Sequence, residues 1–187
     1  DKLVQTDLAA TLERISNEGA DGFYKGPVAE AISNASKANG GIITQEDLAA
    51  YQAQEMSPLQ CSYRGYTIIS APPPSSGGTT ICEILNILSG YDLKALGFRS
   101  AQSVHLMVEA MRHAYLDRNT LLGDPDFVKN PLDRLLSADY AAAIRATIDP
   151  AKASKSADLS STTPPHEKPE TTHYSVLDEK GNAVAVT

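Results

Sequence analysis

The sequence predicts an α+β chain that is rich in helices and holds few strands. Apolar residues recur at three- and four-residue spacing through most of residues 1–148, which is the period of an amphipathic helix. Strand-forming residues gather in the stretch "YRGYTIIS", and the chain ends on an alternating pattern around a Gly-Asn pair, which is typical of a β-hairpin. At 187 residues, of which 42% are hydrophobic, the chain is long enough for one domain with a core.

Three helices are expected in the N-terminal part of the chain. The first is predicted to begin with Thr6 as its N-cap and to stop at Gly19, with its apolar residues on one face. The second is expected from Tyr24 to Lys37, before a pair of glycines. A third, short helix is expected after Thr44, because Asp47 follows three residues later in the arrangement of a capping box.

The middle of the chain changes from strand to helix. Strand formers between Tyr63 and Ile69 are followed by three prolines, which forbid both strand and helix. The turn Ser75–Gly78 then begins a strongly apolar helix that we expect to be buried. A longer helix is predicted over Ser100–Leu121 and another near Ser137. On the long helix, the stripe expected to face the core consists of Val104, Met107, Val108, Met111 and Tyr115.

Charge and composition exclude several classes of function. The formal net charge is −7, and the 16 Lys and Arg residues form no cluster that could neutralise phosphates, so a nucleic-acid partner is not expected. No apolar run approaches the roughly 18 residues of a membrane span. The first residues, "DKLVQTDLAA", do not read as a signal peptide.

The two cysteines, Cys61 and Cys82, are too few for a disulfide framework and lack the spacing of metal ligands. Two ordinary thiols are the simpler interpretation. A bridge between them stays open at this point.

Three polar residues of the long helix, His105, Glu109 and His113, share one face because they are four residues apart. Across eight residues the two imidazoles would lie roughly 12 Å apart along the axis, too far for one zinc ion. A solvated or partly buried polar face is therefore expected there, and no metal site.

Two loops offer weaker candidates. The turn Ser75–Gly78 could hold an anion at a helix N-terminus, but it lacks the lysine of a phosphate-binding loop, so a rigid structural turn is favoured. Asp124 and Asp126 in "GDPDF" could serve as acid/base groups or calcium ligands. Aspartates in such loops more often cap turns locally, and we expect that role.

The segment Asp149–Glu170 has almost no large apolar residue and no period, which predicts a mobile linker. It runs directly into Thr171, at the start of the predicted hairpin. A threonine hydroxyl becomes a nucleophile when its own α-amino group, freed by chain cleavage, takes its proton. The layout of linker, threonine and strand suits that chemistry, although a linker before a hairpin is common without it.

Five stretches together resemble the γ-glutamyltranspeptidases, also called γ-glutamyltransferases or glutathione hydrolases. They are "GGIITQEDLAAY", "YRGYTIISAPPPSSGG", "EILNIL", "EAMRHAYLDRNTLLGDPDFV" and "TTHYSVLDEKGNAVAVT". The resemblance covers essentially the whole chain. It implies a fragment of an N-terminal nucleophile hydrolase with an αββα sandwich, in which a precursor cuts itself into large and small subunits. Residues 1–148 would be the helical large-subunit portion, 149–170 the linker, and 171–187 the first hairpin of the small subunit.

The resemblance also implies the chemistry. Self-cleavage would fall between Glu170 and Thr171, after which Thr171 would attack γ-glutamyl compounds such as glutathione and pass the γ-glutamyl group to water, an amino acid or a peptide. No cofactor or metal is implied. The family's substrate-binding residues are expected outside this chain, in the remainder of the two subunits, so the isolated fragment is expected to be inactive. A periplasmic or secreted location follows from the resemblance alone.

Two neighbours of the threonine need separate hypotheses. Strand alternation puts Thr171, His173 and Ser175 on one face. His173 could act as a base, but the family assigns that work to the α-amine of the threonine. Thr172 could assist self-cleavage.

Two other functions stay open for the whole protein: a related acylase of the same fold, and a non-catalytic binding or assembly module. Exposed strand edges could also lead the fragment to self-associate.

Overall fold

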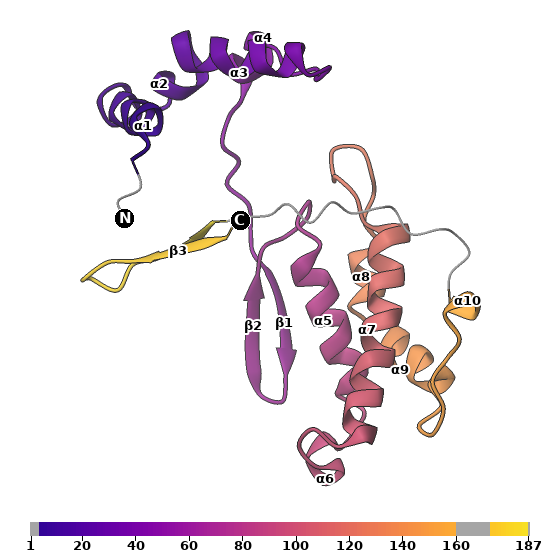
Figure 1. The fold of residues 1–187 in the computed structure, drawn as a ribbon. Helices are drawn as coiled ribbons and strands as arrows, with labels where there is room; N and C mark the ends of the chain where they lie inside the picture. The colour runs from indigo at the N-terminus through magenta and orange to yellow at the C-terminus, as the bar shows by residue number, and fades with distance from the viewer. Residues whose placement is uncertain (1–3, 160–172, 187) are drawn as a thin grey trace. The chain divides into compact units, whose positions relative to one another are not determined.

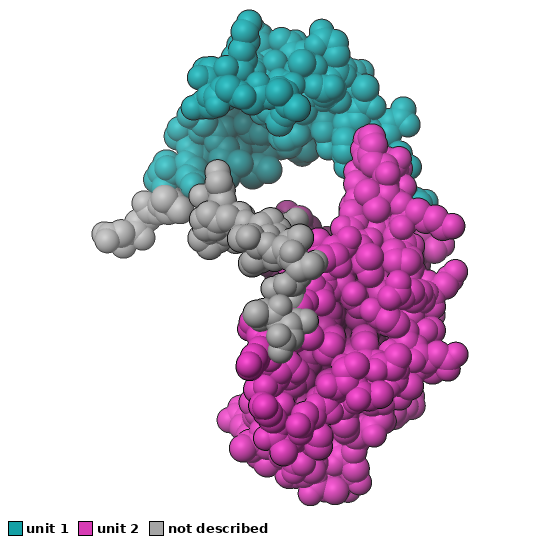
Figure 2. Space-filling view, turned by 90° about the vertical axis from the view of Figure 1, so that its right-hand side faces the viewer, with its two compact units in different colours: residues 1–56 teal, residues 57–187 magenta. Residues whose placement is uncertain are grey.

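The computed structural model of the chain describes residues 4–159 and 173–186. It divides into two compact units, residues 1–56 and residues 57–187 (Figure 2). Helices predominate in the described residues, and the strands form two separate two-stranded sheets (Figure 1). The predicted α+β class, helix-rich with few strands, is confirmed.

The first unit is entirely helical in its described part. Its helices are α1 (Thr6–Glu18), α2 (Asp21–Tyr24), α3 (Gly26–Ala38) and α4 (Gln45–Ala50). Helix α1 ends at Gly19 as expected, where φ is +66°. Its N-cap is Gln5 rather than the predicted Thr6, and the Gln5 side chain makes no capping hydrogen bond.

The helix predicted over Tyr24–Lys37 is confirmed as α3, which begins two residues later, at Gly26. Lys25, between Tyr24 of α2 and Gly26, is extended, with φ −133° and ψ 166°. Pro27 then occupies the first turn of α3, where its fixed φ is favourable. The capping box of α4 is confirmed, since Thr44 Oγ1 accepts a hydrogen bond from the Asp47 amide at 3.1 Å and Asp47 Oδ2 accepts one from the Thr44 amide at 2.9 Å.

The second unit begins with a β-hairpin of β1 (Leu59–Tyr63) and β2 (Tyr66–Ser70), with Tyr63 paired to Tyr66. The two turn residues, Arg64 and Gly65, both have positive φ. This is the requirement of a type I′ turn, whose twist matches that of the flanking strands.

Helix α5 (Gly77–Leu88) follows the prolines and is buried along much of its length, as expected. The turn before it is tight: a side chain at Gly78 would place its Cβ 2.6 Å from the carbonyl oxygen of Ala71. Ser76 Oγ accepts a hydrogen bond from the Arg118 guanidinium at 3.0 Å. These contacts support the structural interpretation of the Ser75–Gly78 turn.

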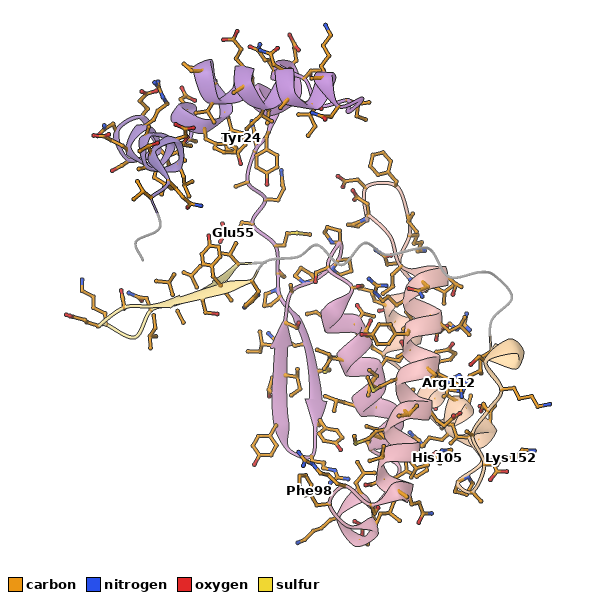
Figure 3. The ribbon with its side chains drawn as sticks, in the orientation of Figure 1. Tyr24, Glu55, Phe98, His105, Arg112 and Lys152 are labelled. Atoms are coloured by element: carbon orange, nitrogen blue, oxygen red, sulfur yellow. A yellow bond between two sulfur atoms is a disulfide. The ribbon has the colours of Figure 1, made fainter. Side chains whose placement is uncertain are left out.

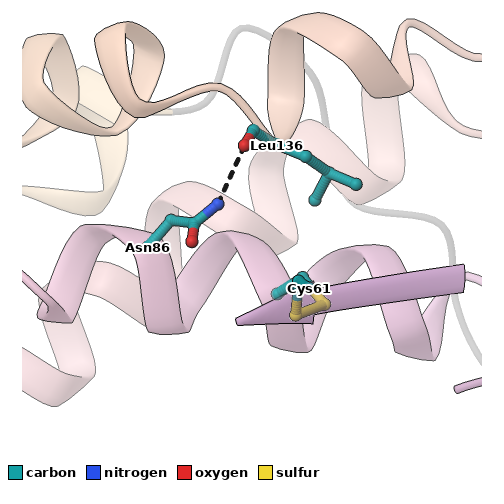
Figure 4. Close-up of a disulfide and its surroundings, with 4 residues drawn as sticks. Cys61, Asn86 and Leu136 are labelled. Atoms are coloured by element: carbon teal, nitrogen blue, oxygen red, sulfur yellow. Dashed lines mark hydrogen bonds between the residues drawn. A yellow bond between two sulfur atoms is a disulfide. The ribbon is translucent and has the colours of Figure 1, made fainter. Parts of the chain in front are cut away.

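A disulfide joins Cys61 of β1 to Cys82 of α5 (Figure 4). The simpler interpretation of two ordinary thiols is therefore wrong. Local pattern gave no sign of the bond, because the two residues lie 21 positions apart and meet only when the hairpin packs on the helix. Near this bond, Asn86 Nδ2 donates a hydrogen bond to the Leu136 carbonyl at 3.0 Å (Figure 4).

The core of the second unit lies between α5, α7 (Ala101–Leu121) and α9 (Ala138–Thr147). Helix α7 has the predicted length, with Ser100 as its N-cap. Its buried apolar residues are Leu106, Ala110 and Ala114, whereas the predicted stripe from Val104 to Tyr115 is 40–48% exposed. That prediction was wrong because α7 has two stripes with helical spacing, and the one with small residues lets α5 approach closely.

The remaining elements of the second unit are short. They are α6 (Leu93–Leu96), α8 (Leu132–Leu135), α10 (Ser156–Leu159), β3 (Tyr174–Leu177) and β4 (Ala183–Val186). Helix α9 starts after Ser137, as predicted, and the Ser137 hydroxyl caps it by accepting from the Tyr140 amide at 3.1 Å. Within the described residues, no helix is long and apolar enough to cross a membrane.

Removing the disulfide is expected to destabilise the second unit. Because the bond limits the freedom of the unfolded chain, the double variant Cys61→Ala/Cys82→Ala should lower the free energy of unfolding by about 2–4 kcal/mol. Urea unfolding monitored by circular dichroism, with and without reductant, measures this. Reductant should lower the free energy of unfolding of the wild type and leave that of the variant unchanged. A variant whose free energy of unfolding lies within about 0.5 kcal/mol of the wild type would contradict the expectation.

Candidate functional site

The predicted self-cleavage residues Glu170 and Thr171, together with Thr172, lie outside the described residues. Their roles stay predictions. The structure describes the chain on both sides of them, up to Leu159 and again from His173, and these two flanks define the candidate site.

The downstream flank is the β3–β4 hairpin, in the register Tyr174↔Val186 to Leu177↔Ala183. All eight strand residues are exposed on both faces in this chain. The predicted hairpin is therefore confirmed. Its apolar side chains, such as Val176 and Val184, are 56% and 57% exposed and would be covered only by contacts outside the described residues.

The turn of this hairpin is held by Asp178. Its carboxylate accepts hydrogen bonds from the Asn182 side chain at 2.7 Å and from the amides of Lys180 and Asn182 at 2.9 and 2.8 Å. The bond from the Asn182 side chain is the main cause that lowers the pKa of Asp178. Gly181 takes φ +82° and donates to the Asp178 carbonyl, so the turn has the backbone that a glycine permits.

His173 and Ser175 lie close together on this hairpin, as strand alternation predicts. Ser175 Oγ is 3.4 Å from His173 Nε2, and His173 is exposed. The role of His173 as a base stays a prediction.

The upstream flank, residues 149–159, lies against α7 (Figure 3). Near its start, the Asp149 carbonyl is 2.8 Å from His105 Nε2. Near its middle, Ser154 meets two charged residues of α7, Glu109 and Arg112. We call these three residues the Glu109 clasp.

The Glu109 clasp consists of four hydrogen bonds. Glu109 Oε2 accepts from the Ser154 hydroxyl at 2.5 Å, and Glu109 Oε1 accepts from the Ser154 amide at 3.2 Å. Arg112 Nη1 donates to Glu109 Oε1 and to the Ser154 carbonyl, each at 2.7 Å. Ser154 therefore has its amide, its carbonyl and its hydroxyl bound to two side chains of one helix.

Glu109 is 1% exposed, so its charge needs partners. Burial alone would raise the pKa of Glu109, but the hydrogen bonds from Ser154 and Arg112 and the charge of Arg112 outweigh it and hold the pKa below its usual range. The carboxylate is thus ionised at neutral pH and accepts from both partners.

The other polar candidates behave as local structure. Among the described residues, no three His, Cys, Asp or Glu side chains could hold a metal ion together, so His105, Glu109 and His113 do not form such a cluster. His113 is partly buried, and burial lowers its pKa. Asp124 Oδ1 accepts from the Asp126 amide at 3.0 Å, which confirms the predicted local turn.

A buried carboxyl pair connects α5, α7 and α9. Glu83, 1% exposed, lies beside Asp117, and the Tyr140 hydroxyl donates to Asp117 Oδ2 at 2.7 Å. Burial, the bond to Asp117 and the charge of Asp117 raise the pKa of Glu83 to about 8. Burial and the same carboxylate raise the pKa of Tyr140 to about 12. Glu83 therefore holds its proton at neutral pH.

Comparison with known proteins shows which family the chain resembles. The profile of the family described as Gamma-glutamyltranspeptidase matches residues 1–187. The chain belongs to the gamma-glutamyltranspeptidase family.

Curated relatives agree with this assignment. Over the whole chain it is 61% identical to a Glutathione hydrolase proenzyme of Pseudomonas sp. (strain A14) and 52% identical to that of Escherichia coli (strain K12). It is also 46% identical to the Acylase ACY 1 proenzyme of Pseudomonas sp. (strain SE83). The chain spans 32–33% of the length of these relatives.

A solved gamma-glutamyltranspeptidase shares the fold. The crystal structure of the Helicobacter pylori protein matches with a TM-score of 0.79 and 47% sequence identity, covering 91% of this chain and 49% of that one. The fold class expected from the resemblance, part of an N-terminal nucleophile hydrolase, agrees with this neighbour.

Sequence reasoning missed the Glu109 clasp and the Glu83–Asp117 pair. Glu109 was noticed only as part of a polar face, and Ser154 was placed in a linker expected to be mobile. The structure gives residues 149–159 defined contacts and a short helix, and the remainder of that linker lies outside the described residues. The polar Glu83 within the apolar helix α5 was the one available signal for the carboxyl pair.

The Glu83–Asp117 pair predicts a pH dependence of stability. Folding holds a proton on Glu83 that the unfolded chain, with an ordinary pKa of 4.5, releases. The free energy of unfolding should therefore fall as pH rises from about 4.5 to about 8.

Glu83→Gln keeps the shape and the donor without the ionisation, so it should remove most of this fall and exceed the wild type in stability at pH 8 by more than about 1 kcal/mol. Urea unfolding at several pH values measures it, with Glu13→Gln on exposed α1 as the matched control. Parallel pH curves for the wild type and Glu83→Gln would contradict the assignment.

Proposed function

We propose that this chain is part of a self-processing γ-glutamyltransferase and glutathione hydrolase. The observation that carries the proposal is the match of the whole chain, across residues 170 and 171, to relatives named Glutathione hydrolase proenzyme. The names describe precursors, and the hairpin that follows Thr171 has the strand structure that the hypothesis requires.

Self-cleavage would proceed by attack of Thr171 Oγ on the carbonyl carbon of Glu170. The peptide bond between them breaks as an ester forms, and water then hydrolyses the ester, leaving a carboxylate on Glu170 and a free α-amine on Thr171. In catalysis this α-amine takes the proton of the Thr171 hydroxyl, whose oxygen attacks the γ-glutamyl carbonyl.

The departing amine takes up a proton, and a γ-glutamyl ester remains on Thr171. Water hydrolyses this ester, or the amine of an amino acid or peptide accepts the γ-glutamyl group. No metal or organic cofactor takes part in these steps.

The substrate would be glutathione or another γ-glutamyl compound, and the pocket would require residues of both subunits beyond this chain. We therefore infer that the 187-residue chain alone is inactive. A periplasmic or extracellular location is supported by the Cys61–Cys82 disulfide, because such bonds persist in oxidising compartments.

An acylase of the same fold is the second candidate. It is favoured by the 46% identity to the Acylase ACY 1 proenzyme, over the same share of the chain as the glutathione hydrolases. Release of glutamate from glutathione, measured beside release of the acyl side chain from a β-lactam, separates the two. A non-catalytic binding module would process neither substrate.

The nucleophile is tested in the full-length protein. Thr171→Ala should abolish release from a chromogenic γ-glutamyl anilide, a loss of about three orders of magnitude or more, because the attacking oxygen is gone. Thr171→Ser retains a hydroxyl and should keep measurable activity. Thr67→Ala, the same change at an exposed position of β2, should leave activity within about tenfold of the wild type.

A trapped intermediate gives an independent readout. Rapid acid quenching during turnover, followed by mass spectrometry of the small subunit, should find one γ-glutamyl group on Thr171. A protein that hydrolyses the anilide with Ala at position 171, or that holds the group on another residue, would contradict this mechanism.

A further inference from the structure

The Glu109 clasp is the strongest contact between residues 149–159 and the folded body. Ser154 Oγ, N and O are bound within 2.5–3.2 Å by Glu109 and Arg112 of α7. The Asp149 carbonyl, 2.8 Å from His105 Nε2, gives a second contact to the same helix. A segment with almost no large apolar residue is thus held by polar bonds.

These bonds are difficult to replace with water. Glu109 is 1% exposed, so the carboxylate would lose two of its donors on release of Ser154 while it stayed buried. A buried ionised group left with too few partners is strongly unfavourable, which keeps the segment bound. Arg112, whose side chain is 22% exposed, is the third residue of the clasp and donates to both Glu109 and Ser154.

We propose that the Glu109 clasp positions the segment that leads into the self-cleavage bond, with Glu109, Arg112 and Ser154 as positioning residues for maturation. This inference rests on the proposed function, because it assigns a purpose to the clasp only if the bond after Glu170 is cut. Ser154 lies 16 residues before Glu170 in the sequence, so the clasp fixes the point from which this length of chain reaches its target.

If the clasp acted only by shortening the free chain, it would have little influence on the rate of self-cleavage. Without the clasp, the nearest buried residue upstream is Ile148, so the free chain before the cleavage bond lengthens from 16 to 22 residues. This lowers the probability that the chain end reaches its target by less than about twofold. A larger effect requires that cleavage proceeds only from the docked segment. The cleavage rate then falls in proportion to the fraction of molecules in which the clasp is closed.

The test uses the full-length protein and two variants. Glu109→Gln removes the negative charge of the clasp on α7. Ser154→Ala removes the hydroxyl of the clasp at a position outside any helix. Each should slow self-cleavage, Glu109→Gln by about fivefold or more, because a weakened clasp opens more often. Glu13→Gln, the same change on exposed α1, should leave the rate unchanged.

Local opening is measured separately, in a Thr171→Ala background that keeps the chain uncut. Trypsin cleaves after Lys152 and Lys155, which flank Ser154, and the rate of these cuts reports opening of the clasp. The loss of self-cleavage rate should follow the gain in trypsin cutting from variant to variant. Turnover of a γ-glutamyl anilide per cleaved molecule should stay unchanged, whereas general destabilisation would lower it too.

The outcomes separate the two proposals. If the wild type never splits at Glu170–Thr171, the proposed function fails and this inference with it. If the wild type splits and both variants open at Lys152 and Lys155 yet split within about twofold of its rate, the inference alone is overturned, since chain entropy accounts for that much.

Discussion

The second unit depends on the burial of one helix, α5, on several sides at once. Within two turns of this helix, Cys82 bonds to β1, Glu83 meets Asp117 of α7, and Asn86 donates to the Leu136 carbonyl. Arg145 of α9 donates to the Asn86 carbonyl at 2.8 Å. Ile87, fully buried, fills the space between these partners. Because β1, α7 and α9 all contact the same short segment of α5, this helix fixes where α7 lies. Helix α7 in turn holds the upstream flank of the candidate site.

Local patterns predicted most elements but not their partners. The capping box at Thr44, the Ser100 and Ser137 caps and the hairpin turn at Gly181 are recognisable because each acts within a few residues. The burial of α7 is not local. Two stripes with the same spacing run along it, and only the packing against α5 selects the one that contains Ala110 and Ala114.

The parts of the candidate site that could not be predicted join residues far apart in the sequence. Cys61 and Cys82 are separated by 21 positions, and Glu109 and Ser154 by 45. No periodicity connects such pairs. The polar composition of residues 149–170 predicts a mobile linker, yet residues 149–159 are held against α7 by charge and hydrogen bonds. The chemistry assigned to Thr171 came from resemblance over the whole chain, because a threonine before a strand is common.

The proposed function requires a precursor that cuts itself before Thr171. The most direct measurement is the intact mass of the full-length protein during incubation at neutral pH, beside its Thr171→Ala variant. We expect the wild type to separate into two chains, the smaller beginning at Thr171, while the variant stays whole. A wild type that stays whole, or a variant that splits at the same bond, would contradict it.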